Sequence, residues 1–220
     1  MTQGQNPNTS DYWDRRFSSG DWDEKGGPSQ TRDFALVFVP RLWVAADFSG
    51  SLWDFGCGAG DAFPVYRAAF PRARLTGIDF SSGAIRHCID RYGDFASFHV
   101  GGVPDVSPCD VIICSNVLEH VDRDEATVEA LLERCHRLFV VVPYKESPLS
   151  FEHLRQYDES SFRDLGPART EVFLSSGWSE YGWDLFWNVW AKNYVKRVVG
   201  RPTRTRRRQV LYEFVGRRAP

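Results

Sequence analysis

The chain of 220 residues is long enough for one substantial domain, and its 42% hydrophobic content provides for a packed core and is unlike that of a disordered chain. Its formal net charge of −2 gives no overall basic signal for nucleic acid. The five cysteines are odd in number and show no CxxC or Cys/His ligand spacing, so they predict reduced thiols, with no metal site and no disulfide framework.

No apolar run approaches the ~20 residues that are needed to span a bilayer. The N-terminus, MTQGQNPNTSD, is polar and lacks a hydrophobic signal segment. These features predict a soluble, cytoplasmic protein that makes no membrane contact.

The spacing of apolar residues predicts alternating strands and helices. The segments that are expected to form strands are 51–55, 74–79, 96–100, 110–115, 138–142, 168–175 and 209–215. The segments that are expected to form helices are 11–17, about 29–46, 62–69, 82–92, 124–137 and 183–199. Ser10 or Asp11 is expected to cap the first helix, and Pro40 to kink or end the second. This alternation predicts an α/β fold with a mostly parallel sheet built from right-handed βαβ units.

Two regions flank the alternating core. Residues 1–46 are expected to form an N-terminal tail and a helical lid, and residues 47–220 the main domain. Within the main domain, a helical and basic insertion over residues 183–208 precedes the last strand. Its helix is expected to carry aromatic residues on one face, which could pack into the core, roof a pocket or form an oligomer interface: Trp183, Phe186, Trp187, Trp190 and Tyr194.

The stretch SLWDFGCGAGD, residues 51–61, places three glycines directly after the first expected strand. Glycine permits positive φ and has no Cβ, so a backbone built from it can lie against a ligand at the start of a helix. The spacing of Gly56, Gly58 and Gly60 is G-x-G-x-G, and the GK[ST] ending of a phosphate-binding P-loop is absent. These glycines alone leave open a structural turn that binds nothing.

A carboxylate follows about 20 residues later. Asp79 ends the second expected strand in LTGID, where a carboxylate can accept hydrogen bonds from the two hydroxyls of a ribose. Capping of the next helix is the simpler interpretation of this aspartate. Together with the glycines, Asp79 favours a nucleoside-containing ligand.

Three segments in this order resemble motifs of a known family. DFGCGAGD, LTGIDFS and DVIICSNVLEHV are similar to motifs I, II and IV of the class I S-adenosylmethionine-dependent methyltransferases, over roughly residues 51–143. The resemblance implies a Rossmann-like, seven-stranded, mostly parallel sheet with helices on both faces and one antiparallel strand, here segment 209–215. It also implies S-adenosyl-L-methionine as the cofactor and S-adenosyl-L-homocysteine as the product.

The same resemblance assigns cofactor-binding residues. The methionine and ribose portion would lie against the first motif, the ribose hydroxyls would bind Asp79, and the adenine would pack beside Phe80. The family often places an acidic residue after the third strand to hold the adenine amino group, whereas this sequence has glycines there, which leaves the backbone near Gly102 and Val103, or Asp105, for that role. The remaining residues assigned to the cofactor are Asp54, Gly56, Cys57, Gly58, Gly60 and Ser115.

The N-terminal segment YWDRRFSSGDW has a looser resemblance to the opening of thiopurine-type small-molecule methyltransferases. That resemblance implies that Tyr12, Trp13, Arg16 and Trp22 close over the cofactor. Packing of these aromatic residues on the core is the alternative.

Two histidines are the candidate general bases. His120 follows the fourth expected strand in SNVLEHV, and His153 follows the fifth in FEHLRQYDESSF, both at the sheet edge where open α/β sheets bind ligands. Either imidazole could take a proton from an acceptor hydroxyl or amine. Orienting the loops is the alternative role for both, and no metal motif accompanies them.

These residues predict a methyltransferase that acts on an oxygen or nitrogen of a small-molecule metabolite, for example one of specialised metabolism. An RNA or peptide methyltransferase that uses the basic segment 201–208 is one alternative, and a non-catalytic partner protein that binds S-adenosylmethionine is another. Nucleic acid is an unfavoured partner because the chain carries no dedicated RNA module or basic face. A homodimer is compatible with the aromatic insertion.

Overall fold

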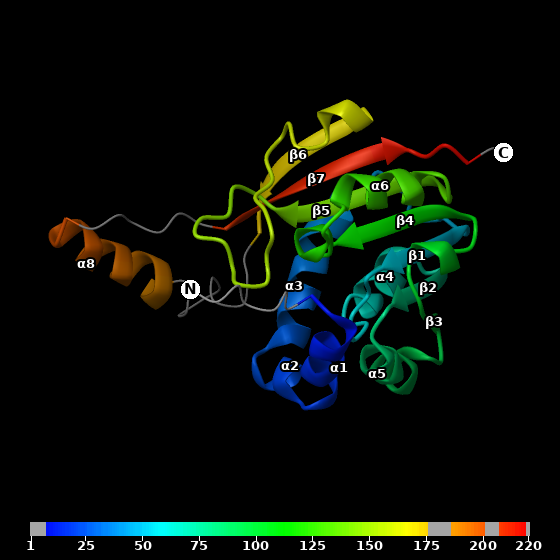
Figure 1. The fold of residues 1–220 in the computed structure, drawn as a ribbon, viewed down its shortest axis with the longest axis horizontal. Coiled ribbons are helices and arrows are strands. Elements are labelled where there is room, and N and C mark those ends of the chain that lie inside the picture. Colours follow the sequence, from blue (N-terminus) through cyan, green and yellow to red (C-terminus); the bar gives the residue numbers. More distant parts are fainter. Residues whose placement is uncertain (1–7, 176–185, 201–206, 219–220) are drawn as a thin grey trace.

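The computed structural model describes residues 8–175, 186–200 and 207–218. Its centre is a seven-stranded sheet in the order β3-β2-β1-β4-β5-β7-β6 (Figure 1). The strands are β1 (Ser51–Phe55), β2 (Arg74–Asp79), β3 (Ser97–Val100), β4 (Cys109–Ser115), β5 (Cys135–Pro143), β6 (Arg169–Leu174) and β7 (Arg208–Val215). All neighbouring pairs are parallel except β5–β7 and β6–β7. The predicted fold class is therefore confirmed, with β7 as the antiparallel strand.

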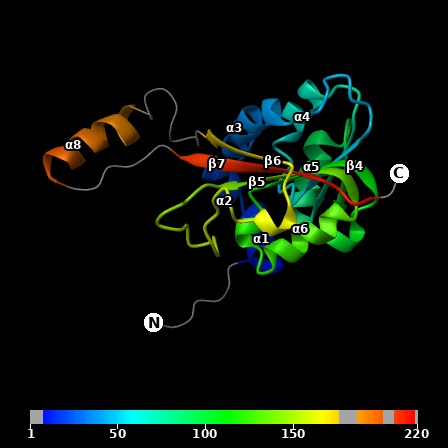
Figure 2. The same ribbon diagram turned by 90° about the horizontal axis from the view of Figure 1, so that it is seen from above.

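Helices cover both faces of this sheet (Figure 2). The α-helices are α1 (Ser10–Ser18), α2 (Asp21–Glu24), α3 (Gly27–Phe38), α4 (Phe63–Ala69), α5 (Ser82–Tyr92), α6 (Asp124–Leu132) and α8 (Lys192–Val198). Shorter 3₁₀ turns are η1 (Val39–Arg41), η2 (Val103–Asp105), η3 (Leu118–His120) and η4 (Arg163–Leu165), and η6 (Phe186–Ala191) is a π-helix.

Two hydrophobic clusters pack against the two faces, because successive residues of a strand point in opposite directions. In β4, Ile113 joins a cluster with residues of α3, α4 and α5, and Ile112 joins one with residues of α6. Phe38 of α3 lies in the first cluster, so the later part of the N-terminal region packs on the sheet. The almost wholly apolar β4 is buried on both sides, as its sequence predicts.

Several predicted boundaries are wrong. The first helix is capped by Thr9, whose side chain accepts a hydrogen bond from the backbone N–H of Tyr12, and not by Ser10 or Asp11. The second begins at Gly27 and gives way to η1 after Phe38, because a proline inside a helix cannot donate the continuing hydrogen bond. The short helix α2 lies between the first two predicted helices, where the sequence predicts no helix.

Another boundary error concerns the predicted helix 124–137. The helix α6 ends at Leu132, and β5 begins at Cys135, which pairs with Cys109 of β4. Arg137 lies between β4 and β7 and pairs there with Glu213. The charged sequence ERCHR, residues 133–137, resembles the exposed face of a helix, although its first two residues form a turn and its last three begin β5.

The described part of the insertion between β6 and β7 is helical over residues 186–198, as predicted. Of the three uses that the sequence left open for its aromatic face, packing into the core is contradicted for the residues that the structure describes. Trp187 is 60% exposed, Trp190 68% and Tyr194 71%. Figures 1 and 2 show α8 lying apart from the sheet. Trp183 and the arginines at 201, 204 and 206 lie outside the described residues.

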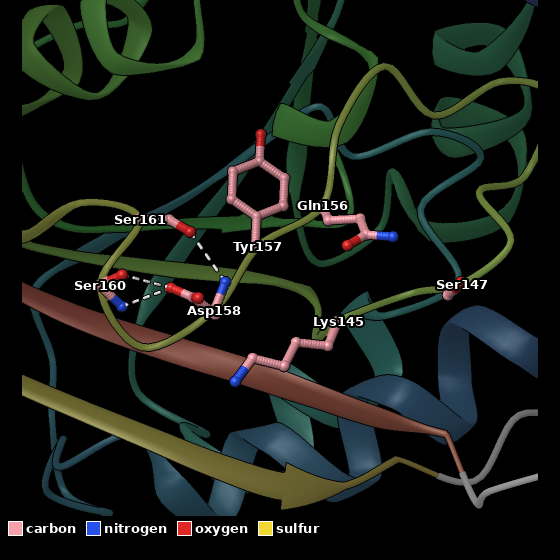
Figure 3. Close-up of a pocket in the computed structure, with 7 residues that line it drawn as sticks. All are labelled: Lys145, Ser147, Gln156, Tyr157, Asp158, Ser160 and Ser161. Carbon is pink, nitrogen blue, oxygen red and sulfur yellow. Dashed lines mark hydrogen bonds between the residues drawn. The ribbon is translucent and has the colours of Figure 1, made fainter.

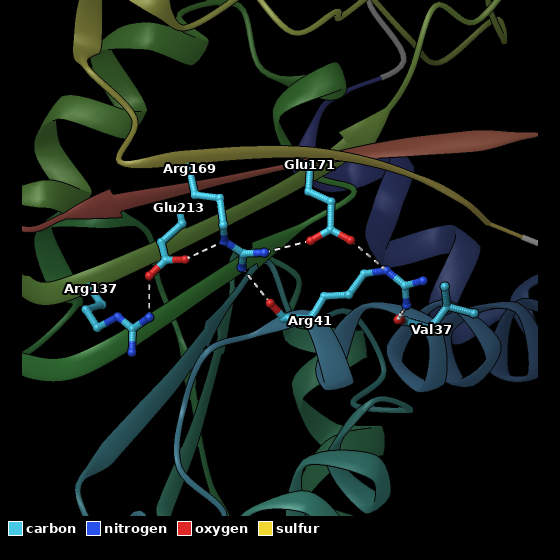
Figure 4. A network of polar contacts seen from close by, with 6 residues as sticks. All are labelled: Val37, Arg41, Arg137, Arg169, Glu171 and Glu213. Carbon is cyan, nitrogen blue, oxygen red and sulfur yellow. Dashed lines mark hydrogen bonds and ion pairs between the residues drawn. The ribbon is translucent and has the colours of Figure 1, made fainter.

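A network of ion pairs fastens the end of the N-terminal region to the antiparallel strands (Figure 4). Arg169 of β6 donates from Nε to Oε2 of Glu213 at 2.9 Å and from Nη1 to Oε2 of Glu171 at 2.6 Å. Its Nη2 also donates to the carbonyl oxygen of Arg41, whose own Nε lies 3.3 Å from Oε1 of Glu171. The network joins η1 to β6 and β7, and in this way holds α3 against the sheet.

Among the described residues, no helix is both long enough and apolar enough to pass through a membrane.

Candidate functional site

The glycine-containing turn after β1 folds back on the end of β2. The backbone N–H groups of Gly56 and Cys57 both donate to the carbonyl oxygen of Ile78, at 2.8 and 3.1 Å. Gly56 has φ +73° and Gly58 φ +52°, a region that strongly favours glycine. A Cβ on Gly56 would lie 2.4 Å from Cγ2 of Val117, so this glycine is also required by close packing.

Asp79 ties this turn to the start of α5. Its Oδ2 accepts a hydrogen bond from the backbone N–H of Gly58 at 2.9 Å, and its Oδ1 accepts one from the N–H of Ser81 at 2.8 Å. Burial raises the pKa of Asp79, and these two hydrogen bonds oppose the rise. Because each carboxylate oxygen can accept a second hydrogen bond, Asp79 retains acceptor capacity toward a ligand.

Asp54 of β1 is buried beside the same turn. Its Oδ2 accepts a hydrogen bond from the hydroxyl of Tyr66 at 3.3 Å. Burial raises the pKa of Asp54 to about 8, against the effect of this hydrogen bond and with a smaller contribution from the charge of Asp79. The side chain therefore lies where a cationic group would stabilise its ionised form.

The residues assigned to the adenine surround the end of β3. The ring of Phe80 is 47% exposed directly after β2, and the backbone N–H of Gly102 donates to Oδ2 of Asp105 at 2.9 Å. Val103 begins the turn η2 and is half-buried. Asp105 thus contacts the backbone of Gly102, and its role toward the adenine amino group stays a prediction.

Helix α1 covers this region. Oδ1 of Asp14 accepts hydrogen bonds from the hydroxyl of Ser81 at 2.6 Å and from the N–H of Gly83 at 3.0 Å, and these bonds lower the pKa of Asp14. Phe17 lies over the glycine turn, since a Cβ on Gly58 would be 3.3 Å from its ring. Asp14 and Phe17 therefore dock α1 on the predicted cofactor site.

The other side of α1 contacts the segment after β5. The hydroxyl of Tyr12 and Nη1 of Arg16 both donate to Oε1 of Glu152, and Arg16 also donates to the Tyr12 hydroxyl at 3.0 Å. Trp13 packs edge-on to the ring of His120, with 5.2 Å between ring centroids. The structure thus brings Tyr12, Trp13 and Arg16 together, and the partner Glu152 is a residue that the sequence did not single out.

The two candidate bases lie side by side, with 4.9 Å between their ring centroids. Nδ1 of His120 lies 3.1 Å from the carbonyl oxygen of Glu152, and Nδ1 of His153 is paired with Oε2 of Glu146. Burial, reinforced by His153, lowers the pKa of His120 to about 4. Burial also acts to lower the pKa of His153, but the hydrogen bond to Glu146 and nearby carboxylates raise it overall.

Glu119 completes this group. It is 1% exposed, and its Oε2 has no hydrogen-bond partner. Burial raises the pKa of Glu119 to about 7, and the charge of His153 opposes the rise. One ligand atom from each of Glu119, His120 and His153 lies within 4.8 Å of the others.

A polar group borders these residues at the end of β4. The amide of Asn116 donates to the hydroxyl of Ser115 at 2.9 Å, and the buried amide of Gln209 donates to Oδ1 of Asn116 at 2.8 Å. Asn116 has φ +56°, a strained conformation for a non-glycine residue. Ser115, assigned to the cofactor from sequence, therefore lies at the turn between β4 and η3.

An open cavity of about 630 Å³ lies beside the segment that follows β5 (Figure 3). The residues that line it are Lys145, Ser147, Gln156, Tyr157, Asp158, Ser160 and Ser161. Asp158 is held in place by hydrogen bonds from the backbone and hydroxyl of Ser160, at 2.8 and 2.6 Å. No residue assigned to the cofactor lines this cavity, which is on the side expected for the acceptor.

The sequence did not identify three carboxylates as functional partners: Asp14, Glu146 and Glu152. Glu152 directly precedes a histidine that was singled out, and Asp14 lies within the YWDRRF segment. Both carboxylates therefore lie in or beside segments that the sequence singled out. The side chains that donate hydrogen bonds to them, however, are at least 67 residues away in the chain.

Residues 53–140 match a family model that describes a methyltransferase domain. The comparison with curated proteins finds no match.

Solved structures share the fold at low sequence identity. The plantazolicin methyltransferase BpumL in complex with S-adenosylhomocysteine matches with a TM-score of 0.58 and 17% identity, over 96% of each chain. Coclaurine N-methyltransferase bound to N-methylheliamine and S-adenosylhomocysteine matches with a TM-score of 0.61 and 11% identity, over 84% of this chain and 70% of that one. A chain from the complex that contains the Haloferax volcanii Trm112 methyltransferase activator matches with a TM-score of 0.65 and 17% identity, over 93% and 97%.

Proposed function

We propose that this chain, which has the class I sheet order and matches a methyltransferase-domain model over residues 53–140, uses S-adenosylmethionine to methylate an oxygen or nitrogen of a small-molecule metabolite. The observation that carries the proposal is the position of α1. This helix contacts the glycine turn through Phe17 and His120 through Trp13. An acceptor that reaches the donor between these contacts must fit beneath a helix, which favours a small molecule over a folded RNA.

In the proposed complex, the donor lies along the carboxyl ends of β1 and β2. The hydroxyls of its ribose donate to Asp79, whose oxygens each retain a free lone pair. Its ammonium lies near Asp54, which is buried and gains from a cationic partner. Phe80 supports the adenine, and Gly102 and Val103 border it.

Methyl transfer is an in-line displacement at the sulfonium carbon. A lone pair on the acceptor forms the new bond to the methyl carbon, the electrons of the carbon–sulfur bond pass to sulfur, and the acceptor loses its proton. The positive sulfur already activates the methyl group, so the protein mainly aligns the reactants and excludes water. The product is S-adenosylhomocysteine.

The lid residues support water exclusion. Arg16 is half-buried and pairs with the buried Glu152, and this contact joins α1 to the segment that follows β5. His120 and His153 lie on the acceptor side of that contact, where either can receive the proton that the acceptor loses.

The first test is calorimetric titration of the purified protein with S-adenosylhomocysteine. We expect binding that is lost in Gly58→Val, because a branched side chain would meet Phe17 and would be strained at φ +52°. Circular dichroism of this variant checks that it is folded. A folded wild-type protein that binds neither S-adenosylmethionine nor its product would refute the proposal.

The second test is transfer of a labelled methyl group to a panel of small hydroxyl- and amine-containing compounds, with RNA and peptides as competing acceptors. Small-molecule labelling supports the proposal. Labelling of RNA alone, with binding that weakens steeply as salt is added, would replace it with nucleic-acid modification.

A homodimer remains a prediction. The exposed Trp187, Trp190 and Tyr194 provide apolar surface that such a dimer could cover. Light scattering gives the molecular mass in solution, and a monomer at all concentrations would contradict the prediction.

A further inference from the structure

We propose that Glu119, His120 and His153 form a binding site for a divalent first-row transition-metal ion. The three side chains offer ligand atoms within 4.8 Å of one another. Glu119 and His120 come from η3, which follows β4, and His153 comes from the segment after β5. The site therefore lies at the carboxyl ends of two neighbouring parallel strands. The proposal goes beyond methyl transfer, and with an ion bound His120 and His153 would serve as ligands instead of as proton acceptors.

The first argument is the hydrogen bonding of His120. Its Nδ1 lies 3.1 Å from the carbonyl oxygen of Glu152. A carbonyl oxygen only accepts hydrogen bonds, so Nδ1 carries the hydrogen in this contact and Nε2 of the neutral ring keeps its lone pair. The backbone of Glu152 therefore selects the tautomer that can ligate a metal through Nε2.

His153 is held in a comparable way. Its Nδ1 is paired with Oε2 of Glu146, and a carboxylate oxygen likewise accepts the hydrogen. Histidines that bind metals commonly donate their second ring N–H to a carboxylate or a backbone carbonyl, which fixes the ring and strengthens the ligand. The two histidines of this group have one partner of each kind.

The third ligand has a buried oxygen without a hydrogen-bond partner. Glu119 is 1% exposed, and its Oε2 makes no hydrogen bond. Burying a carboxylate without compensation costs several kcal/mol, so such an oxygen calls for a cation or a proton. In the part of the chain that the structure describes, no lysine or arginine forms an ion pair with Glu119 or Glu146.

The backbone brings the ligands together. The N–H of Leu154 donates to the carbonyl oxygen of Glu119 at 2.8 Å, which fixes His153 beside η3. Trp13 of α1 covers the His120 ring from the other side. The group is thus positioned by contacts that do not themselves require a metal.

The donor set indicates the class of metal. Two imidazoles and one carboxylate suit Zn²⁺, Fe²⁺, Co²⁺ or Mn²⁺, whereas Mg²⁺ and Ca²⁺ prefer oxygen ligands. Bond lengths of about 2.0–2.2 Å place ligand atoms roughly 3–3.5 Å apart, so any pair that lies near the 4.8 Å limit must move closer when an ion binds. Three protein ligands leave positions for water or an acceptor oxygen, whose pKa the ion would lower.

The proposal is tested by titrating chelator-treated protein with Co²⁺ and recording its visible absorption. We expect uptake of one equivalent, with the absorption of an ion bound by nitrogen and oxygen ligands. Glu119→Gln keeps the shape of the side chain but removes its charge, and His153→Ala removes a ligand. Each is expected to lower the Co²⁺ affinity more than 10-fold, and Glu146→Gln about 10–100-fold, because its carboxylate orients a ligand.

His136→Asn is the matched control, because this histidine lies at the start of β5, at the opposite edge of the sheet. It is expected to leave Co²⁺ uptake unchanged. Titration of every preparation with S-adenosylhomocysteine, together with circular dichroism, shows whether the protein is folded and whether the donor site is intact.

Two results would overturn the proposal. Folded wild-type protein that binds S-adenosylhomocysteine but takes up no Co²⁺ would refute the metal site, and the proposed function would stand. Equal Co²⁺ uptake by wild type, Glu119→Gln and His153→Ala would place the ion elsewhere. Failure to bind S-adenosylhomocysteine would count against the proposed function, whatever the outcome with Co²⁺.

Discussion

Replacement of Asp54 by asparagine should change how the stability of the unliganded protein depends on pH. The carboxyl group lies at the end of β1 and is 4% exposed. Burial raises its pKa from 3.8 to about 8. An asparagine side chain at this position would have nearly the same shape but would not titrate, so the Asp54→Asn variant isolates the contribution of this proton.

The sign follows from the direction of the shift. A raised pKa means that the folded state holds the proton more tightly than the unfolded state, so the contribution is fully present below pH ~4 and is lost as the pH rises through about 8. A single such group loses about 1.4 kcal/mol of unfolding free energy per pH unit within this window. Between pH 6 and pH 8 the loss amounts to about 2 kcal/mol, since the titration is half complete at the upper end.

Urea unfolding of wild type and Asp54→Asn at pH 6, 7 and 8, followed by circular dichroism, measures this contribution. We expect the wild-type advantage over the variant to shrink by about 2 kcal/mol across the range. Asp110→Asn is the control, because a hydrogen bond from the backbone N–H of Ser51 lowers the pKa of Asp110 and keeps it ionised throughout. A difference between wild type and Asp54→Asn that stays constant with pH would refute the reasoning.

Three further substitutions test the site. Gly56→Ala should lower the unfolding free energy by about 1–3 kcal/mol, because its Cβ would meet Val117. Gly166→Ala, at a similar φ but with open space around it, should lower the unfolding free energy less. Equal thermal shifts for the two variants would contradict this. Asp79→Asn should weaken binding of S-adenosylhomocysteine about 10–100-fold through loss of a charged acceptor, and unchanged affinity by calorimetry would exclude the ribose role. Arg16→Met should speed amide hydrogen exchange in α1, because the ion pair that holds the helix is lost, and unaltered exchange would show that the pair contributes nothing.

The sequence predicts the central elements because their signals are local. The strands β1 and β2 and the helix α5 have the bounds that the sequence predicts. Two of these boundaries are marked by a particular residue. Gly56 directly follows the end of β1, and Ser81 caps the start of α5, where its side chain accepts a hydrogen bond from the N–H of Ala84. Elements with such marks can be located from a single sequence.

The start of β5 has no such mark. Residues 133–137, ERCHR, carry charges that suit the outside of a helix, and the strand conformation of residues 135–137 depends on pairing with β4 and β7. Arg137 finds its partner Glu213 76 residues further along the chain. A prediction based on neighbouring residues has no access to that pairing, and it therefore extended α6 too far.

The candidate site shows the same division between local and distant information. The sequence identified His120 and His153 separately, as residues that follow parallel strands. Their contact, and the unpartnered oxygen of Glu119 beside them, depend on the path of the chain after β5. Sequence reasoning therefore found two of the three residues but gave no reason to expect a metal site.

Helix α1 links the two halves of the site more closely than the sequence suggested. Phe17 and Asp14 hold it on the glycine turn and the start of α5, and Arg16 and Trp13 hold it on Glu152 and the His120 ring. These four residues lie within two turns of one helix, so a displacement that uncovers the predicted donor site also loosens the cover over the histidines. If the proposed function holds, entry of the donor and access to the acceptor side are coupled through this one helix, and weakening either set of contacts should affect both.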